Sequence, residues 1–463
     1  MNFRVPSRTF LVAALFVIVF TAVSIPSDAG SKTSNPLITP DSSGSLSTFD
    51  KNGGIDVSNP FFQNLGSNGR TCNTCHVSSQ AWSVTPESIQ ARFNGSNGTD
   101  PIFRPVDGAV CPSADVSTKA ARSSAYRQLL SKGLIRVSLS VPANAEFTIV
   151  DVSDPYNCPE TTATNPAFFR RPLPSTNLGF LSAVMWDGRE SGSGKSLEDS
   201  LASQAIDATT GHAEAKTAPT ADQVRKIVAF EKALFTAQTN DEFAGSLSAR
   251  TAKGGPMSLS TQDFFIGIND PLGGNPTGKN FDPVAFTTFA AWGDLTGSDN
   301  ANRARRSIAR GQALFNSLPI AITNVRGLND SLNMEVIQGT CTTCHDSPNV
   351  GNHSMPLALD IGVVDPAPPV LDVAGLPVYT VVCNATSQMY RVTDLGRAMI
   401  TGKCVDIGKT KGPILRALSA RAPYFHNGSA ATLNDVVEFY DQRFTLNLSQ
   451  QQKSDLVAFL KSL

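Results

Sequence analysis

The pentapeptide Cys-x-x-Cys-His occurs twice in this 463-residue chain, as residues 72–76 and as residues 341–345. Two thiols at this spacing can add across the two vinyl groups of one porphyrin, and the histidine that follows can reach its iron. The two copies therefore predict two covalently bound haem c groups. The expected attachment residues are Cys72, Cys75, Cys341 and Cys344, and the expected iron ligands are His76 and His345.

A Cys-x-x-Cys pair can instead hold zinc or act as a redox dithiol. Zinc requires further Cys or His ligands nearby, and the next histidine after His76 is His212. In the second half, His345 and His353 could complete a Cys2His2 site. The immediate histidine in both copies favours haem, and zinc is the alternative.

The N-terminal segment is typical of a secretory signal peptide. Arg4 and Arg8 precede an apolar run over 10–25, and small residues up to Ala29 offer a cleavage position. We expect residues 1–29 to be a signal peptide, with an uncleaved anchor helix as the alternative because the run nearly spans a bilayer. Covalent haem attachment occurs outside the bacterial cytoplasm, so an exported protein agrees with the two Cys-x-x-Cys-His motifs. We therefore expect a periplasmic or secreted bacterial protein without membrane contact after cleavage.

The composition narrows the partners and the cysteine chemistry. The formal net charge is −1, so nucleic acid and anionic membranes are not expected partners. Four of the 8 cysteines lie outside the two motifs, and in an oxidising compartment they could form two disulfides. The simplest pairing joins Cys111 to Cys158 and Cys383 to Cys404. Four cysteines permit two other pairings, and free thiols are a further alternative.

Local patterns indicate the elements that position these residues. Residues 30–60 are rich in Ser, Gly, Asn and Pro and predict a loose arm. The turn-rich segment of about 95–170 contains short β-like runs at 134–141 and 146–152, which indicate a small β-containing insertion. Residues 253–285 are typical of a long loop.

Helix-start signals occur in both halves. Capping boxes at Thr220 and Ser449, and a related signal at Thr432, each precede a run with helical spacing, and residues 306–315 share that spacing. We expect a mainly α fold, with two cytochrome c-type haem domains joined by long loops. The predicted domains are residues 30–300 with the first haem and 301–463 with the second.

Several further segments carry a family resemblance. Residues 421–440 (RAPYFHNGSAATLNDVVEFY), the segments 394–397 (DLGR) and 412–416 (GPILR), and residues 186–189 (WDGR) followed by SLE and QA are similar to the bacterial di-haem cytochrome c peroxidase and MauG family. The match covers both haem motifs, about 186–214 and most of 302–463. It does not cover the insertion.

The resemblance implies roles for three catalytic residues. Trp186 would lie between the two haems and aid electron passage. Gln204 would orient a peroxide by hydrogen bonds, and Glu214 would move a proton between its two oxygens. Two of the three residues also have a plainer interpretation: Trp186 could be a core residue, and Glu214 could be a solvated loop charge.

His212 is the competitor at the first haem. Many family members have a sixth ligand in a loop soon after the first motif, but residues 77–104 here contain no His or Met. His212 could be that resting ligand or a distal base. We favour a first haem with an open coordination position.

The sixth ligand of the second haem is expected to be Tyr440, which stands where typical peroxidases have Met and MauG-type members have Tyr. A phenolate ligand would lower the reduction potential. The rival ligands are His426, His353, Met355 and Met399. The resemblance also allows calcium between the domains, held by the carbonyls of Arg421 and Pro423.

The sequence thus predicts a peroxidase-like haem oxidoreductase. It would reduce hydrogen peroxide with electrons from a small donor protein, a cytochrome c or a cupredoxin, passed from the C-terminal to the N-terminal haem. The alternatives are MauG-like or oxygenase-like oxidation of another substrate and a non-enzymatic di-haem electron carrier. The resemblance also allows a homodimer.

Overall fold

The computed structural model describes residues 32–192 and 194–463, so the predicted signal peptide lies outside the described residues. Within this part the chain forms eleven α-helices and thirteen short strands. The helices are α1 (Pro86–Ser96), α2 (Lys119–Ala125), α3 (Arg127–Lys132), α4 (Leu197–Gly211), α5 (Ala221–Ala233), α6 (Pro256–Leu259), α7 (Asn300–Ser317), α8 (Asn329–Leu332), α9 (Ala398–Thr401), α10 (Leu433–Phe444) and α11 (Gln450–Lys461).

The strands build small sheets only. They are β1 (Leu37–Asp41), β2 (Gly44–Asp50), β3 (Ile135–Ser138), β4 (Phe147–Ser153), β5 (Ala167–Arg170), β6 (Leu234–Asp241), β7 (Gly245–Ser246), β8 (Ile320–Thr323), β9 (Val336–Gly339), β10 (Ala358–Leu359), β11 (Val378–Cys383), β12 (Met389–Val392) and β13 (Thr410–Lys411). The prediction of a mainly helical chain is therefore confirmed in part, because sheets occur in both halves.

The predicted helix starts are confirmed. Complete capping boxes open α5 at Thr220, α10 at Thr432 and α11 at Ser449, so side chains satisfy backbone N–H groups that lack a partner within the helix. In the second half, α7 packs against α11, and both contribute to an aromatic core. Phe315 of α7 and Phe459 of α11 meet there with ring centroids 5.5 Å apart.

The prediction of a loose arm over residues 30–60 is wrong. This segment forms β1 and β2, which join β6 and β7 in a four-stranded antiparallel sheet of order β1-β2-β6-β7. The reason lies in the small side chains of β2, which allow close packing. Thr48 is buried, its hydroxyl lies 2.9 Å from that of Thr236 on β6, and it accepts a hydrogen bond from the indole of Trp82 at 3.0 Å.

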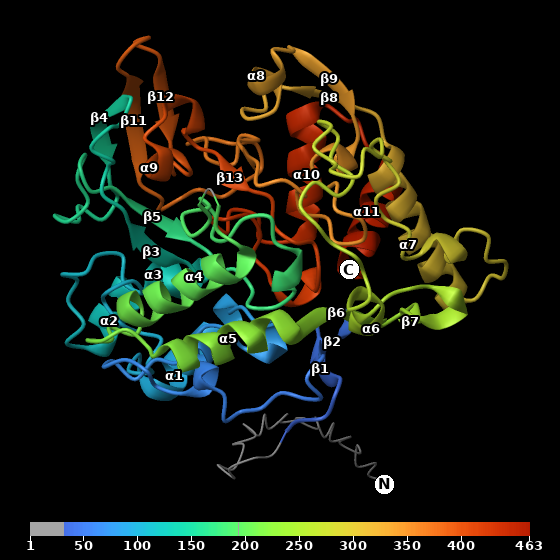
Figure 1. The fold of residues 1–463 in the computed structure, drawn as a ribbon, viewed down its shortest axis with the longest axis horizontal. Helices are drawn as coiled ribbons and strands as arrows, with labels where there is room; N and C mark the ends of the chain where they lie inside the picture. The colour runs from blue at the N-terminus through green and yellow to red at the C-terminus, as the bar shows by residue number, and fades with distance from the viewer. Residues whose placement is uncertain (1–31, 193) are drawn as a thin grey trace, which may run out of the picture.

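The insertion of the first half is tied to the second half by a shared sheet. Strand β4 pairs antiparallel with β11, which also pairs with β12. Figure 1 shows these three strands together, with the teal β4 beside the orange-red β11 and β12. The predicted β-like runs thus become β3 and β4. The two predicted domains share backbone hydrogen bonds rather than meeting through side chains alone.

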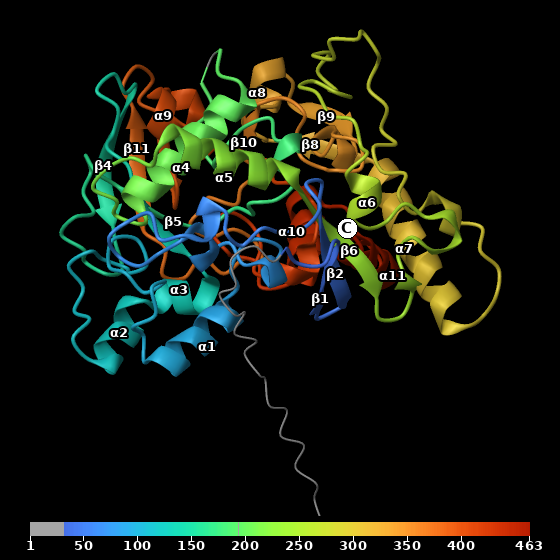
Figure 2. The same ribbon diagram turned by 60° about the horizontal axis from the view of Figure 1, so that its bottom comes forward.

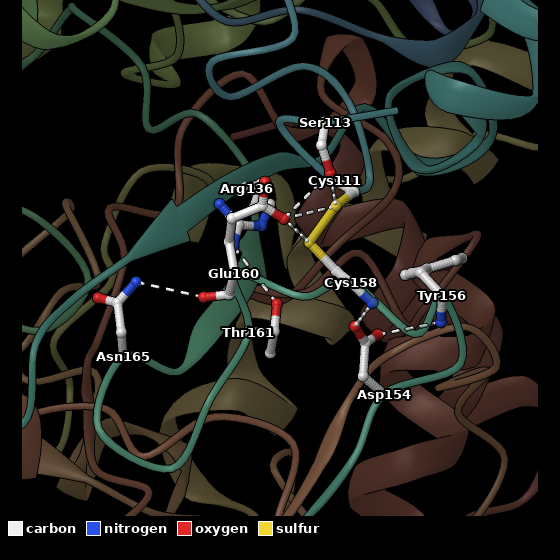
Figure 3. The surroundings of a disulfide bond; sticks show 9 residues. All are labelled: Cys111, Ser113, Arg136, Asp154, Tyr156, Cys158, Glu160, Thr161 and Asn165. Atoms are coloured by element: carbon white, nitrogen blue, oxygen red, sulfur yellow. Dashed lines mark hydrogen bonds between the residues drawn. A yellow bond between two sulfur atoms is a disulfide. The ribbon is translucent and has the colours of Figure 1, made fainter. Parts of the chain in front are cut away.

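Both expected disulfides are present, which confirms the simplest pairing of the four cysteines outside the motifs. Cys111 is bonded to Cys158 with a Cα–Cα distance of 5.4 Å, and Cys383 to Cys404 at 5.9 Å. Figure 3 shows the first bond, with a Glu160 carboxylate oxygen 3.0 Å from each sulfur. The second bond links β11 to the segment after α9.

Across residues 32–192 and 194–463, none of the helices combines the length and the apolar character that a bilayer crossing requires.

Candidate haem cavities

The two Cys-x-x-Cys-His motifs adopt the same local structure. Each begins with one turn of 3-10 helix, at Cys72–Thr74 and at Cys341–Thr343. In each, the threonine before the first cysteine and the threonine three residues later form reciprocal cap hydrogen bonds. Both thiols and the histidine of each motif therefore lie on one tight turn that the motif's own residues stabilise.

The two motif histidines are also oriented alike. The Nδ1–H of His76 donates to the carbonyl of Trp82 at 3.0 Å, and that of His345 donates to the carbonyl of Gly351 at 2.6 Å. Such a bond at Nδ1 leaves the Nε2 lone pair free for a metal. Burial lowers the pKa of His76 to about 4, so its imidazole is neutral and able to ligate.

Each motif lines a large cavity. The cavity at Cys72, Cys75 and His76, called the first cavity, has about 1640 Å³ of space free of atoms. The second cavity, at Cys341, Cys344 and His345, has about 1910 Å³, and both volumes include space open to solvent. The walls are mainly apolar, as a porphyrin face requires.

The motif cysteines are suited to thioether bonds rather than to zinc. All four are free thiols, and burial raises the pKa of Cys72, Cys341 and Cys344 to about 12. Zinc deprotonates the thiols that it binds, so the decisive requirement is that it needs four ligands close together. Among the described residues, the clusters of potential metal ligands include none of these cysteines. The zinc alternative, including the Cys2His2 site with His353, is therefore not supported.

The two cavities adjoin at Trp186. Trp186 lines both cavities, and its indole N–H donates to the carbonyl of Arg171 at 2.8 Å. The residues that line both are Arg171, Pro172, Leu173, Pro174, Trp186, Lys411, Pro413 and Arg421. The structure thus puts Trp186 in the wall between the two motif sites, where the resemblance implies an electron relay.

Three buried cations and the half-buried Arg421 line this wall or its edge without an acidic partner. Within the described part of the chain, none of Arg171, Lys411, Arg416 and Arg421 forms an ion pair, and Nη1 of Arg416 and Nε of Arg421 have no hydrogen-bond partner. Burial lowers the pKa of Lys411 to about 7 and that of Arg171 to about 9. Buried cations are costly unless an anion meets them. The two propionate carboxylates of a haem are anions of the right kind, so the cavities fit that cofactor.

A buried ionic network joins the segments that carry the family resemblance. The guanidinium of Arg170 donates to both oxygens of Asp394, at 2.7 and 2.8 Å, and also to Asp187. Burial alone would raise the pKa of Asp394, but Arg170 outweighs burial and holds that pKa below its usual value. His426 lies nearby, its ring 6.1 Å from that of Trp186. The WDGR, DLGR and APYFH segments therefore meet in space.

The first cavity receives Gln204 but not Glu214. Gln204 lies on α4 and lines the cavity. The Glu214 side chain is exposed, accepts a hydrogen bond from Asn68 at 2.8 Å, and does not line the cavity. The loop after α4 turns Glu214 outward with a positive φ of 52°. The structure therefore does not bring Glu214 to Gln204.

His212 lines the first cavity in place of Glu214. Its Nδ1–H donates to the carboxylate of Asp107, which also accepts from Nη1 of Arg70 at 2.8 Å. Burial would raise the pKa of Asp107, but Arg70 and His212 outweigh it and hold that pKa below its usual value. Sequence reasoning missed Asp107, because it lies in the insertion and no local motif marks it.

The second cavity narrows the choice of a sixth ligand. Tyr440, His353 and His426 line it, whereas Met355 and Met399 do not. Burial raises the pKa of Tyr440 well above its usual value, so this phenol is neutral in the protein as described. Burial lowers the pKa of His353 and of His426 to about 4. All three residues therefore line the same cavity as the second motif, and each is a candidate for the sixth ligand.

One of the two carbonyls expected to hold calcium has a partner in the protein. The carbonyl of Arg421 accepts a hydrogen bond from the guanidinium of Arg171 at 3.2 Å. Calcium at this position stays a prediction.

Several known proteins that are similar in sequence to this chain are named as cytochrome c peroxidases. The chain is 36% identical to cytochrome-c peroxidase IdrP2 of Denitromonas iodatirespirans over 137 residues, which is 27% of this chain and 36% of the relative. It is 28% identical to cytochrome-c peroxidase IdrP1 of Pseudomonas sp. (strain SCT) over 190 residues, 37% of this chain and 43% of the relative. It is 31% identical to the cytochrome c551 peroxidase of Nitrosomonas europaea over 148 residues, which is 30% of this chain and 37% of the relative.

The predicted resemblance to cytochrome c peroxidases is confirmed by these relatives. No family model matches the chain. The matched regions span well under half of the length of each of these peroxidases. A MauG-like protein associated with microbial copper homeostasis is similar at 16% identity over 87% of this chain and 85% of that one, with a TM-score of 0.38. The peroxidase relatives do not favour the alternative activities.

Proposed function

We propose that this protein is a di-haem peroxidase that reduces hydrogen peroxide with electrons from a small redox protein. The observation that carries this proposal is the pair of cavities, each with one Cys-x-x-Cys-His motif, that share the wall containing Trp186. Two redox centres on either side of one indole allow two electrons to reach one oxidant. The similarity to named cytochrome-c peroxidases supports the same conclusion.

In this proposal each cavity holds one haem c in its own haem domain. Cys72 and Cys75 would carry the first and Cys341 and Cys344 the second, with His76 and His345 as axial ligands. When bound, the haems supply the redox chemistry of peroxide reduction. The buried cations in the shared wall would neutralise propionates. Tyr440, His353 and His426 are the candidates for the other axial position in the second cavity.

The residues of the first cavity would handle the proton. The Nδ1–H of His212 is held by Asp107, so Nε2 is the nitrogen left to accept a proton from one peroxide oxygen and return it to the other. Asp107, held in turn by Arg70, fixes the ring and stabilises the imidazolium that forms. Gln204 would orient the peroxide from α4. We assign the acid–base role to His212 rather than Glu214 because Glu214 does not line the cavity.

Electrons would enter at the second cavity and pass Trp186 to the first. The donor in this proposal is a small cytochrome c or cupredoxin, and the location is periplasmic. The kind of donor follows from the peroxidase assignment, and the location follows from the N-terminal sequence.

Haem content is the direct test of the cofactor assignment. Denatured protein should retain two covalently attached haems per chain by the pyridine haemochrome spectrum, and Cys72→Ser/Cys75→Ser should retain one. Ferric protein should give both high-spin and low-spin signals in EPR. Protein without covalent haem, or with two low-spin haems that peroxide does not perturb, would overturn the proposal.

Peroxide turnover with a reduced cytochrome c tests the proton-handling residues. We expect His212→Gln to lose about 10²–10⁴-fold in kcat, the usual contribution of a positioned acid–base group. Glu214→Gln is the matched control and should change kcat by less than about threefold, since an exposed group does not move the proton. The reverse ranking would return the role to Glu214.

A further inference from the structure

A second cluster of ligand-forming side chains lies beside the second motif, and two of its three members have no part in the function proposed above. It consists of Asp270, Asp346 and His353, each at most 3% exposed. Asp270 belongs to the long loop that precedes the second half, whereas Asp346 directly follows His345. One ligand atom from each of the three lies within 4.8 Å of those of the other two.

The charges in this cluster are not balanced by the protein. In the part of the chain that the structure describes, no lysine or arginine pairs with Asp270 or Asp346, and the only ion-pair contact is with His353. Two buried carboxylates without a cation are strongly unfavourable. A positive charge must therefore be supplied either by protons or by a bound cation.

The distances favour a cation over a shared proton. Nδ1 of His353 faces Oδ1 of Asp346 at 3.5 Å, which is too long for an N–H···O hydrogen bond. Two ligands of one tetrahedral ion at about 2.1 Å lie roughly 3.4 Å apart. The backbone N–H of Met355 lies 3.4 Å from the same Nδ1, which is also longer than a normal hydrogen bond and leaves the lone pair of this nitrogen free for a metal.

Asp270 supplies an independent observation. Its Oδ2 accepts from the backbone N–H of Gly274 at 2.6 Å, but its Oδ1 is buried without any hydrogen-bond partner. A buried carboxylate oxygen without a donor requires an explanation, and a metal ion is one that such oxygens commonly bind. The residue is held toward the cluster by its neighbour Asn269, whose side chain donates to the carbonyl of Asp346 at 3.1 Å.

We infer that Asp270, Asp346 and His353 form a site for a divalent transition-metal ion. Two carboxylate oxygens and one imidazole nitrogen suit Zn²⁺ or Mn²⁺, and three protein ligands leave room for a water. Such an ion would fasten the 253–285 loop to the turn that carries His345. None of the three ligands lines the first cavity, so the inference is separate from the proton-handling residues proposed there. His353 also lines the second cavity, and the inference assigns it to this ion, which leaves Tyr440 and His426 as the candidate haem ligands.

Zinc binding by the full protein tests the site. Haem-loaded protein is treated with EDTA, desalted, incubated with one equivalent of Zn²⁺ and desalted again, and zinc per chain is measured by mass spectrometry beside iron. We expect one Zn²⁺ per chain and a higher unfolding temperature with Zn²⁺ than without it. Asp270→Asn should weaken Zn²⁺ binding at least 100-fold and abolish the thermal shift.

The variants separate this site from surface binding and from misfolding. Asparagine keeps an acceptor for Gly274, so the Asp270 loop is expected to fold. Asp282→Asn changes an exposed carboxylate of the same loop and should bind zinc like the unchanged protein. The inference is overturned if the unchanged protein holds no zinc after desalting, or if both variants lose zinc equally.

Discussion

At the scale of single residues, Trp186 is the most informative position. The resemblance alone assigns it a relay role, and the structure adds that its indole is fixed by Arg171 in the wall common to both cavities. A ring held in one orientation between the two cavities is expected to pass electrons better than a mobile ring. The role can be separated from packing, because the chain offers for comparison a buried tryptophan, Trp292, that lies outside both cavities.

We predict that Trp186→Phe slows electron passage between the haems while the fold survives. The lost indole hydrogen bond should reduce the free energy of unfolding by about 1 kcal/mol. Stopped-flow absorbance after rapid reduction would measure the rate. Trp292→Phe is the control, since Trp292 also donates to a backbone carbonyl, that of Ala249 at 2.9 Å, but lines neither cavity. Equal rates in both variants would contradict the relay.

Glu231 gives a pH-dependent prediction. This α5 residue lines the first cavity, and burial raises its pKa from 4.5 to about 7. The folded state thus binds a proton that the unfolded state has released, so its contribution to stability is complete below pH 4.5 and is lost as the pH rises through about 7.

Glu231→Gln should remove this loss, which amounts to at most about 3 kcal/mol for the full shift. Urea unfolding at pH 5 and pH 8 would measure it, and the stability difference between the two pH values should shrink in the variant. The exposed Glu242→Gln should leave that difference unchanged. An unaltered pH profile in Glu231→Gln would show that the buried carboxyl is not the titrating group.

At the scale of elements, the helix ends and the strands β3 and β4 were predictable, whereas the strands β1 and β2 were not. Thr220, Thr432 and Ser449 act within one helical turn, so a short sequence window contains the whole interaction. Strand β2 is stabilised by Thr236 and Trp82, which lie far away along the chain, and its Ser and Thr residues alone resemble a loop. Propensity is a weak guide where tertiary packing decides.

The same argument applies to the sites. Each Cys-x-x-Cys-His motif is contiguous in sequence, so the sequence predicts that its two thiols and its histidine lie close together, and the structure has them on one turn. The contact of Asp107 with His212 joins segments 105 residues apart, and Glu214 was placed by family spacing alone. No local pattern reports on either. The cations of the shared wall could not be predicted either, because they come together only in the folded chain.

The disulfides allow a prediction about the elements that they cross-link. Cys111–Cys158 closes a separation of 47 residues and Cys383–Cys404 one of 21. Loop-closure entropy then gives a stabilisation of about 4 and about 3 kcal/mol, respectively. Replacing each pair by serines should lower the denaturant midpoint, with the larger effect for Cys111–Cys158. Covalent haem content should stay unchanged, because neither bond involves a motif cysteine.

At the scale of the whole molecule, Arg170 holds the two halves together. It sits between Asp187 of the first half and Asp394 of the second, and all three side chains are at most 3% exposed. Removing one member of a buried ionic cluster leaves the others uncompensated. Burial of this kind makes the cluster a strong determinant of how the halves assemble.

Arg170→Met should therefore cost about 3–5 kcal/mol in the free energy of unfolding, measured by denaturant titration. Arg225→Met, which removes an arginine from an exposed pair with Asp222, should produce no measurable change. A small effect of the Arg170 change would mean that both carboxylates find other donors, such as Arg189 for Asp187.

The pairing of β4 with β11 has a consequence for how the chain is made. The partner of Phe147 is Cys383, so this strand must wait through the synthesis of more than two hundred further residues before its hydrogen bonds can form. Contacts of such long sequence separation slow folding and leave unpaired strand edges exposed meanwhile. A chain interrupted before β11 would carry a bare edge and tend to aggregate, which gives a quality-control step reason to act on incomplete copies.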